Sequence, residues 1–263
     1  MKNWSGMPVI LAFGGFDPTG GAGVLMDSRA AAAAGVHASA VVSCLTVQTT
    51  ASFSRFASVP RDVLDESLAA AVKCFPLRAI KVGMVGTRAA AEAILSFIAA
   101  HRDLPLVLDP VLRSSSGAPL LSSSALPAYR QLLRRAAVLT PNLPEAEKLL
   151  DRRIVSFDDA AKAAGELSGL TGASVVLKGG HFPWRGRRGT DIVFSDGQTT
   201  FLPPTGARRG DPHGTGCALA AMIAARIATG ERVVPAVLAA KSLLSKLVAG
   251  GFPSTEGRPI LFR

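Results

Sequence analysis

The sequence has few cysteines and no segment that resembles a leader or a linker. Its three cysteines, Cys44, Cys74 and Cys217, form no CxxC pair, which excludes a disulfide framework and a zinc site and favours the reducing cytoplasm. Residues 1–6 lack the long apolar stretch of a signal peptide, and the apolar helical stretches carry too many charges to span a membrane. No Ser/Gly run, Pro run, acidic tail or repeat interrupts the 263 residues. We therefore expect a single domain over residues 1–263, with no membrane partner.

Aromatic residues are also scarce, and Tyr129 is the only tyrosine. The net charge of +10 comes mostly from arginines scattered in short groups. A nucleic-acid surface would need clustered cations and stacking aromatic side chains. We expect no nucleic-acid partner and interpret the charge as an arginine-rich surface that suits anionic substrates.

What the sequence does have is an alternation of buried strands and helices. Short apolar runs bounded by Gly, Pro or Asp are typical of parallel strands, and alanine-rich stretches between them have helical spacing. Ser122 and the pair Asp158 and Asp159 are the expected helix caps. The turn at 195–197 predicts a β-hairpin over 190–202. The expected fold is α/β with three layers: a mostly parallel central sheet with helices on both faces. The expected strands are 9–13, 40–47, 79–82, 106–108, 137–139 and 174–177; the expected helices are 24–34, 62–72, 87–100, 122–135, 158–167, 214–229 and 233–248.

The sharpest motif is the run His213-Gly214-Thr215-Gly216-Cys217, which opens an alanine-rich helix. Glycines allow successive backbone N–H groups to face an anion, and the helix N-terminus adds partial positive charge. We expect an anion hole here for a transferring phosphoryl group. A cysteine in the first helical turn is expected to have a lowered pKa and to take a proton from an attacking hydroxyl. The alternative is a glycine turn into a packed helix, with Cys217 as a small buried filler.

A glycine-dense loop, residues 13–23, follows the first expected strand directly. It is not a GxGxxG sequence, and the chain contains no GxxxxGK[ST] phosphate loop. So many glycines allow the backbone to approach a flat ligand or another loop. The alternative is a flexible connection between a strand and a helix.

Polar side chains follow three further strands. Asn142 and Glu145 are three residues apart at the start of a helix, where oxygen ligands would suit hydrated Mg²⁺. A helix cap followed by an acidic first turn explains the same letters. Asp109 is placed to share the field of the metal, and Lys178 to pair with a phosphate. Each of these charges is also common as an ordinary solvated side chain.

Taken in order, these motifs resemble the hydroxymethylpyrimidine/phosphomethylpyrimidine kinase family of thiamine biosynthesis, within the ribokinase-like superfamily. Cysteine at position 217, where most ribokinase-like enzymes have aspartate, is the most specific feature. The resemblance covers nearly the whole chain and rests on residues 17–23, 48–50, 81–84, 108–111, 140–146, 177–181 and 213–217.

This resemblance implies a ribokinase-like fold, ATP and Mg²⁺ as cofactors, and phosphorylation of a pyrimidine alcohol and then of its monophosphate. We also expect a homo-oligomer, as a dimer. The implied catalytic residues are Cys217 as base and Gly214, Thr215 and Gly216 as anion hole. The implied substrate residues are Gly15, Asp17, Gln48, Met84 and Val111. Lys178, Asn142 and His213 are implied at the nucleotide, and Asp109 and Glu145, with Asn142 beside them, around the metal.

Four positions depart from the family pattern. Phe16 replaces a small hydroxyl residue and Leu25 a frequent glutamine, and both are expected to reshape the substrate pocket. Ser115 and Ala118 replace a usual lysine and aspartate, which is expected to weaken the hold on phosphates or slow the second phosphorylation. Two alternatives stay open: a pyridoxal/pyridoxine kinase, whose substrate also carries a hydroxymethyl group on an aromatic nitrogen ring, and a ligand-sensing relative without turnover.

Overall fold

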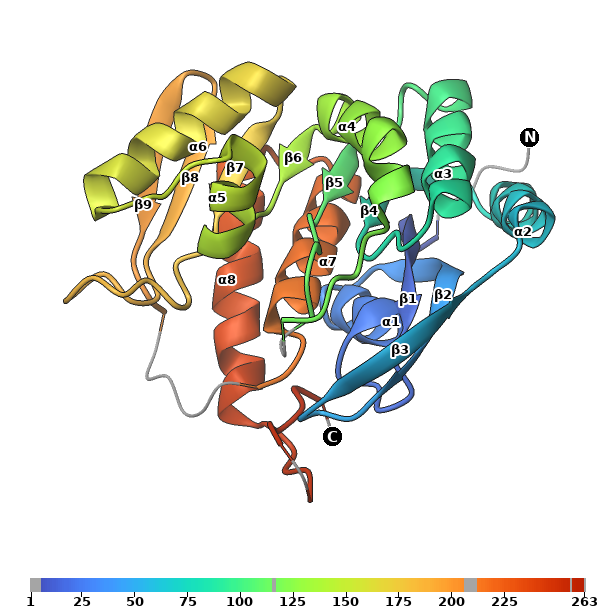
Figure 1. Cartoon of the computed structure of the whole chain (residues 1–263), viewed down its shortest axis with the longest axis horizontal. Helices are drawn as coiled ribbons and strands as arrows, with labels where there is room; N and C mark the ends of the chain where they lie inside the picture. Colours follow the sequence, from blue (N-terminus) through green and yellow to red (C-terminus); the bar gives the residue numbers. More distant parts are fainter. Residues whose placement is uncertain (1–5, 115–116, 206–211, 256, 263) are drawn as a thin grey trace.

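A single twisted sheet forms the centre of the molecule (Figure 1). The computed structural model describes residues 6–114, 117–205, 212–255 and 257–262. In these residues the strand order is β3-β2-β1-β4-β5-β6-β7-β8-β9. In this order, the strands from β2 through β1 to β7 pair in parallel. Strand β3 pairs antiparallel with β2, β8 with β7, and β9 with β8. The mostly parallel α/β sheet predicted from the sequence is confirmed. The strands are β1 Val9–Phe16, β2 His37–Gln48, β3 Phe53–Ser58, β4 Leu77–Val82, β5 Leu106–Leu108, β6 Val138–Leu139, β7 Ser174–Leu177, β8 Asp191–Ser195 and β9 Gln198–Leu202.

Helices cover both faces of the sheet because the central strands are apolar on both faces. In β1, Leu11 and Phe13 join a core with α2, α3, α4 and α6, while Ile10 joins a core with α1, α7 and α8. Figure 1 shows these two helical layers on either side of the sheet. The helices are α1 Gly23–Ala33, α2 Arg61–Cys74, α3 Arg88–Ala100, α4 Leu126–Arg135, α5 Leu143–Leu150, α6 Phe157–Thr171, α7 Thr215–Ala228 and α8 Val233–Ala249.

Two expected helix caps are wrong. The side chain of Ser156 caps α6 by accepting a hydrogen bond from the Asp159 backbone N–H, so the two aspartates lie in the first turn. Ser122 precedes a short 3₁₀ turn and makes no side-chain cap bond. Serine accepts this bond as readily as aspartate does, and the chain entered the helix two residues earlier than the acidic pair suggested.

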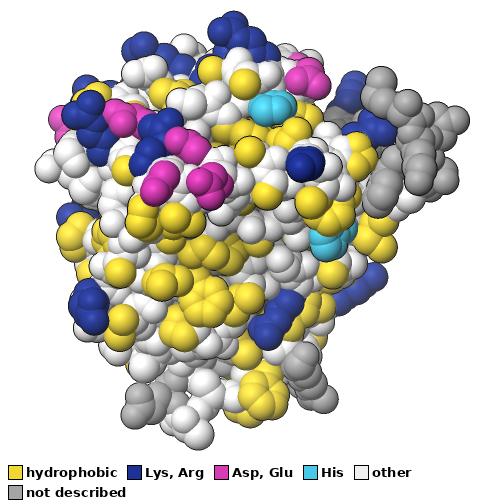
Figure 2. Space-filling view, turned by 90° about the vertical axis from the view of Figure 1, so that its right-hand side faces the viewer, with side chains coloured by type: hydrophobic (Ala, Val, Ile, Leu, Met, Phe, Trp, Pro, Cys, Tyr) yellow, Lys and Arg dark blue, Asp and Glu magenta, His cyan; other side chains and the backbone are white. Residues whose placement is uncertain are grey.

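A β2–β3 ribbon extends beyond the rest of the sheet. Pairing of β1 with β2 ends at Leu45, and the later β2 residues pair with β3 alone. Leu45 and Val47 of β2 are 52% and 48% exposed. Figure 2 views the side of the molecule that carries α2 and β3, and hydrophobic side chains gather across its middle and lower part. No helix in the described ranges is long and apolar enough to cross a membrane.

The segment that follows α8 returns to the sheet's carboxyl end. Ile260 forms a parallel bridge with His213, just before α7. On the other side, Gly257 lies so close to the β2–β3 connection that a β-carbon there would be 2.5 Å from the Ala51 backbone nitrogen. Ser254 and Thr50 also hydrogen bond through their hydroxyls at 3.0 Å. This segment therefore connects the turn before α7 with the β2–β3 ribbon.

Candidate active site

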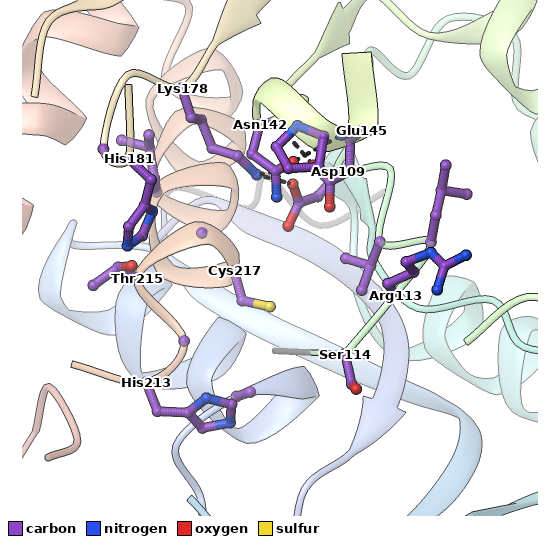
Figure 3. Close-up of a pocket in the computed structure, with 18 of the residues that line it drawn as sticks. Asp109, Arg113, Ser114, Asn142, Glu145, Lys178, His181, His213, Thr215 and Cys217 are labelled. Carbon is purple, nitrogen blue, oxygen red and sulfur yellow. Dashed lines mark hydrogen bonds and ion pairs between the residues drawn. The ribbon is translucent and has the colours of Figure 1, made fainter. Parts of the chain in front are cut away.

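A cavity of about 1020 Å³ opens where the parallel strands end. This is where the doubly wound topology predicts a ligand site, because the loops that follow neighbouring strands meet there. Figure 3 shows side chains from several of these loops around the cavity. Every site residue that the sequence predicts lines it: Gly15, Asp17, Gln48, Met84, Asp109, Val111, Asn142, Glu145, Lys178, His213, Gly214, Thr215, Gly216 and Cys217.

Asp109 and Lys178 form the centre of a charged cluster at one end of the cavity. The Lys178 Nζ donates to Asp109 Oδ1 at 2.6 Å, and Thr140 donates to the same oxygen at 2.9 Å. Burial opposes ionisation of Asp109, but the charges of Lys178 and Lys81 and these hydrogen bonds bring its pKa below the ordinary value. Burial likewise opposes the charge on Lys178, yet the two nearby carboxylates raise its pKa. Asp109 is therefore ionised at neutral pH, and its second oxygen has no such donor within the described residues.

Asn142 and Glu145 form a reciprocal cap at the start of α5. Asn142 Oδ1 accepts the Glu145 N–H at 2.9 Å, and Glu145 Oε2 accepts the Asn142 N–H at 2.7 Å. The cap that the sequence left as an alternative is thus present. The cap uses the side-chain oxygen of Asn142, so a direct bond from that oxygen to a metal ion would break the cap. Glu145 still faces the cluster, with Oε2 3.8 Å from Lys178 Nζ (Figure 3).

The two carboxylates have the chemistry of a site for a hydrated divalent cation. Burial raises the pKa of Glu145 to about 7; Lys178 opposes the shift and the negative charge of Asp109 adds to it. A cation would relieve this repulsion. In the described part of the chain no three His, Cys, Asp or Glu side chains gather as a metal-binding group. The two carboxylates suit an ion such as Mg²⁺, which prefers oxygen ligands, keeps most of its water and binds few protein ligands.

Asp17 lines the cavity, but its carboxylate is occupied. It accepts hydrogen bonds from the Thr19 backbone and hydroxyl at 2.9 Å each, and His213 Nε2 lies 3.4 Å from Oδ2. Burial opposes it, yet the His213 ring and Thr19 lower the pKa of Asp17. The carboxylate is only 1% exposed. The geometry therefore does not favour direct substrate binding through the Asp17 carboxylate. Asp17 instead connects the glycine loop to His213.

The glycine loop and the turn before α7 pack backbone against backbone. Gly214 has φ of +80°, and a β-carbon on it would lie 1.8 Å from the Gly21 carbonyl oxygen. A β-carbon on Gly23 would lie 2.1 Å from the Gly15 carbonyl oxygen. No other residue fits these approaches. The loop thus brings α1 and α7 together at their N-termini, which gives the predicted anion hole two helix ends.

Cys217 lies in the first turn of α7 and points into the cavity (Figure 3). The expected low pKa is wrong: burial raises the pKa of this thiol to about 11, although Lys81 and the Gly23 backbone N–H act to lower it. The helix end therefore does not outweigh the loss of hydration in the protein without ligands. At neutral pH the resting form of Cys217 is the thiol.

The other end of the cavity has an apolar wall. Met84, Cys44 and Leu120 form a small buried cluster against which Phe53 and Val111 pack. Gln48, at the end of β2, brings a side-chain amide to this region. Gly15 allows Met84 to pack closely against the backbone, because a β-carbon there would lie 3.1 Å from the Met84 sulfur.

The departures from the family pattern have less effect on the cavity than expected. Phe16 and Leu25 are not among the residues that line it, so the expected reshaping of the pocket by these side chains is wrong. The Ala118 carbonyl accepts the Ser114 N–H at 2.8 Å and the Ala118 N–H donates to Ser114 Oγ at 3.0 Å, and Ala118 does not line the cavity either. Ser115 lies outside the described residues. Arg113, which the sequence analysis overlooked, lines the cavity and donates to the Gly117 carbonyl at 2.8 Å.

Sequence reasoning also missed two buried lysines. Lys241 of α8 donates to Asp191 Oδ2 at 2.6 Å and to two backbone carbonyls, and Asp191 Oδ1 accepts the Gly179 N–H at 2.7 Å. This pair holds the loop that follows Lys178. No local signal could have joined positions so far apart. Lys81 of β4 donates to both carboxylate oxygens of Asp27 at 2.8 Å. For this pair the sequence did contain a signal of a buried charge, because Lys81 lies inside an apolar strand.

The structural comparisons place this fold among ribokinase-like kinases. The chain is similar to the phosphomethylpyrimidine kinase of Clostridium difficile, with a TM-score of 0.79 and 26% identity over 92% of this chain and 99% of that one. It is also similar to the Staphylococcus aureus pyridoxal kinase in complex with AMP-PCP and pyridoxal, with a TM-score of 0.81 and 25% identity over 97% and 93% of the two chains.

The chain belongs to the phosphomethylpyrimidine kinase family, whose model matches residues 17–259. The hydroxymethylpyrimidine/phosphomethylpyrimidine kinase of Aquifex aeolicus is 32% identical over 256 residues, which cover 96% of this chain and 99% of the relative. The resemblance found in the sequence is thereby confirmed, and the chain is a phosphotransferase of thiamine biosynthesis.

Proposed function

We propose that this cavity transfers the γ-phosphoryl group of ATP to the hydroxymethyl group of 4-amino-5-hydroxymethyl-2-methylpyrimidine, and then phosphorylates the monophosphate to the diphosphate. One observation carries the proposal. A single cavity joins the apolar wall near Gln48 to the anion-hole turn and to the charged cluster around Lys178. Ring recognition and phosphoryl transfer thus have adjacent places.

The pyrimidine ring belongs at the apolar end. Gly15, Met84 and Val111 supply flat contacts, and the Gln48 amide both donates and accepts, which suits an aminopyrimidine edge. The hydroxymethyl group is then directed toward the turn that contains Gly214.

The triphosphate belongs between the turn and the cluster. The backbone N–H groups of Gly214, Thr215 and Gly216 and the positive ends of α1 and α7 stabilise negative charge on the transferring group. The Lys178 ammonium is placed to move from Asp109 to a phosphate oxygen, because both are anions. The Asn142 amide nitrogen, which the cap leaves free of the Glu145 bond, and His213 are further donors toward the nucleotide.

Asp109 and Glu145 are the residues that would hold Mg²⁺ through water. When bound, the ion would neutralise charge on the phosphates and compensate the repulsion between the carboxylates.

The remaining part of the proposed reaction is the removal of the hydroxyl proton from the substrate. The alcohol oxygen forms a bond to the γ-phosphorus, the bond to the ADP oxygen breaks, and the alcohol proton passes to the sulfur of Cys217. This requires the thiolate, which the raised pKa makes a minor form in the free enzyme. In a loose transition state the proton leaves late, so a scarce base still suffices for turnover.

An ATP-consumption assay with the pyrimidine alcohol, its monophosphate and pyridoxal in parallel tests the proposal. We expect turnover with both pyrimidines. The structural likeness to a pyridoxal kinase makes pyridoxal the second candidate, and turnover with pyridoxal alone would replace the proposed substrate. Binding of all three without ADP release would indicate a ligand-sensing relative.

Association of two copies stays a prediction. The half-exposed Leu45 and Val47 on the β2–β3 ribbon give it a candidate surface. Light scattering on the wild type and on Leu45→Lys tests it: a dimer that Leu45→Lys dissociates supports this surface, and a monomeric wild type contradicts it.

A further inference from the structure

The fully buried pair Lys81 and Asp27 has no part in the function proposed so far. Lys81 projects from β4 and Asp27 from α1, and their side chains are 1% and 0% exposed. Within the described residues, Lys81 Nζ donates only to the two Asp27 oxygens, each at 2.8 Å. A β-carbon on Gly83 would lie 2.7 Å from Lys81 Nζ, so the strand after Lys81 leaves space for the ammonium.

A buried ion pair of this kind is seldom retained for stability. Removing two charges from water costs about as much as their attraction returns, and apolar side chains of similar size often stabilise a core equally well. The surroundings of the pair are largely apolar, since Ala79, which shares the Lys81 face of β4, and Met26 of α1 are fully buried members of the core on that side of the sheet. The pair is therefore expected to act on something nearby.

Its neighbour is Cys217. Gly23 and Asp27 are four residues apart on α1 and so share one face of the helix, and α1 packs against α7, where Cys217 begins the first turn. Lys81 and Cys217 both line the cavity, whereas Asp27 does not, so Lys81 is the member of the pair that lies at the cavity wall it shares with the thiol. Among charged groups acting on Cys217, Lys81 has the largest effect and lowers the thiol pKa, and Asp27 and Asp109 oppose it. Lys178 also reaches the first turn of α7, since a β-carbon on Gly216 would lie 3.3 Å from its Nζ, and a charge on Cys217 raises its pKa.

We propose that Lys81, held by Asp27, is a positioning residue that stabilises the thiolate of Cys217. The inference rests on the proposed role of Cys217, but it concerns proton affinity and not turnover. The ammonium stays charged in place, and the sulfur exchanges its proton beside it. Asp27 fixes the ammonium and weakens its field, so the two residues act on the thiol in opposite directions.

The pH dependence of iodoacetamide alkylation at Cys217 tests the proposal without relying on turnover. The Cys74→Ser background removes the exposed thiol, and Cys44 is fully buried; Cys217→Ser gives the blank. Lys81→Met should raise the apparent pKa of the thiol by about 1 unit or more, since charges at this range shift a pKa by about 1–3 units. Asp27→Asn should lower it. At a fixed pH below both values, one unit corresponds to about a tenfold change in alkylation rate.

The double variant Lys81→Met/Asp27→Leu leaves no orphan charge, so it covers the case in which a single variant does not fold. It should also raise the thiol pKa. The control is Lys241→Met, which removes another buried lysine, bonded to Asp191 at 2.6 Å; it should leave the apparent pKa of the thiol in place even though stability falls.

Opposite shifts in the two single variants, or a raised pKa in the double variant alone, support the proposal. An unchanged profile in both Lys81→Met and the double variant overturns it, as does a shift in the same direction for Lys81→Met and Asp27→Asn. Failure of the proposed base role is separate: Cys217→Ser would then keep its turnover, whatever the thiol titration shows.

Discussion

The Gly21 carbonyl oxygen lies directly against the α-carbon of Gly214, where a β-carbon would be 1.8 Å away. One residue belongs to the loop after the first strand and the other to the turn before α7. Their contact joins the proposed substrate side of the cavity to the proposed anion hole. A side chain on Gly214 would collide with this carbonyl, and a β-carbon on Gly21 would lie 2.8 Å from the His213 ring and 2.9 Å from the Ile260 side chain.

Gly214→Ala should therefore abolish turnover. The new methyl group collides with backbone, and alanine at a φ of +80° is strained by about 1–2 kcal/mol in addition. Gly230→Ala is the matched control, because Gly230 has φ of +93° and nothing within 4 Å of a new β-carbon. It should lose only a little thermal stability. Turnover and melting temperature of both variants check this, and equal losses would indicate strain alone.

Lys178→Met should raise the Michaelis constant for ATP and reduce turnover. Loss of one charged hydrogen bond costs about 1.5–3 kcal/mol. Because Lys178 also compensates two buried carboxylates, stability should fall too, which the sequence alone did not lead us to expect. Lys162→Met, at an exposed lysine of α6, should change neither quantity. Unchanged ATP kinetics in Lys178→Met would remove this lysine from the nucleotide site.

Cys217→Ser should reduce turnover by about 10²-fold or more with little effect on substrate affinity. The raised thiol pKa further predicts that kcat/KM of the wild type keeps rising with pH beyond the ordinary thiol range. Cys217→Asp should move the rise to much lower pH, because a carboxyl group titrates near pH 4 in water. A wild-type profile that is flat from pH 7 to 9 would exclude Cys217 as the titrating base.

The raised pKa of Glu145 predicts how the free energy of unfolding changes with pH. Its folded pKa is about 7 against an ordinary value of 4.5, so between these values the folded state binds more protons than the unfolded state. This carboxyl should therefore lower the free energy of unfolding as pH rises through that window, by roughly 1–3 kcal/mol. Urea unfolding of wild type and Glu145→Gln at pH 5 and 7.5 measures it. The variant should lose less stability than the wild type on going to pH 7.5, and added Mg²⁺ should reduce the difference.

Lys241→Met should destabilise the protein by about 3–5 kcal/mol, because it leaves Asp191 buried and unpaired. Since Asp191 also binds the Gly179 N–H, the loop after Lys178 should loosen and the affinity for ATP should fall. Lys246→Met, at an exposed lysine of the same helix, is the control. Chemical denaturation and ATP titration separate the two effects. Normal ATP affinity in a folded Lys241→Met would limit the pair to a structural role.

Much of the fold was predictable because buried parallel strands leave short apolar runs. The runs at 106–108 and 174–177 coincide with β5 and β7. Strand β3 was missed, since Ser54, Arg55 and Ser58 leave no apolar run, and only its pairing with β2 makes it a strand. A ribbon of two exposed strands has little hydrophobic pattern to detect.

The members of the site were predictable, but their electrostatics were not. The motifs identified Cys217 and Asp17, yet the sequence could not show that burial would raise the pKa of the thiol or that Thr19 and His213 would occupy the carboxylate. Both effects depend on desolvation and on partners brought together by the fold. Lys81 and Asp27 are 54 residues apart, and only the structure reveals their pairing.

The cavity draws its lining from Gly14 through to Arg258, with contributions from nearly every loop between them. While the ribosome is still synthesising α7, the pieces already made can pair β1 with β2 and β4 but have no anion hole. Ligand binding can therefore assist only the last stage of folding. Until then, the carboxyl ends of the strands in the nascent sheet stay exposed to solvent. Chains with such long-range closure fold slowly and rely on chaperones more than chains with local contacts do. We expect substrate supply to affect the yield in cells only by stabilising the finished protein. ATP should therefore protect released chains from proteolysis and should not protect ribosome-bound chains.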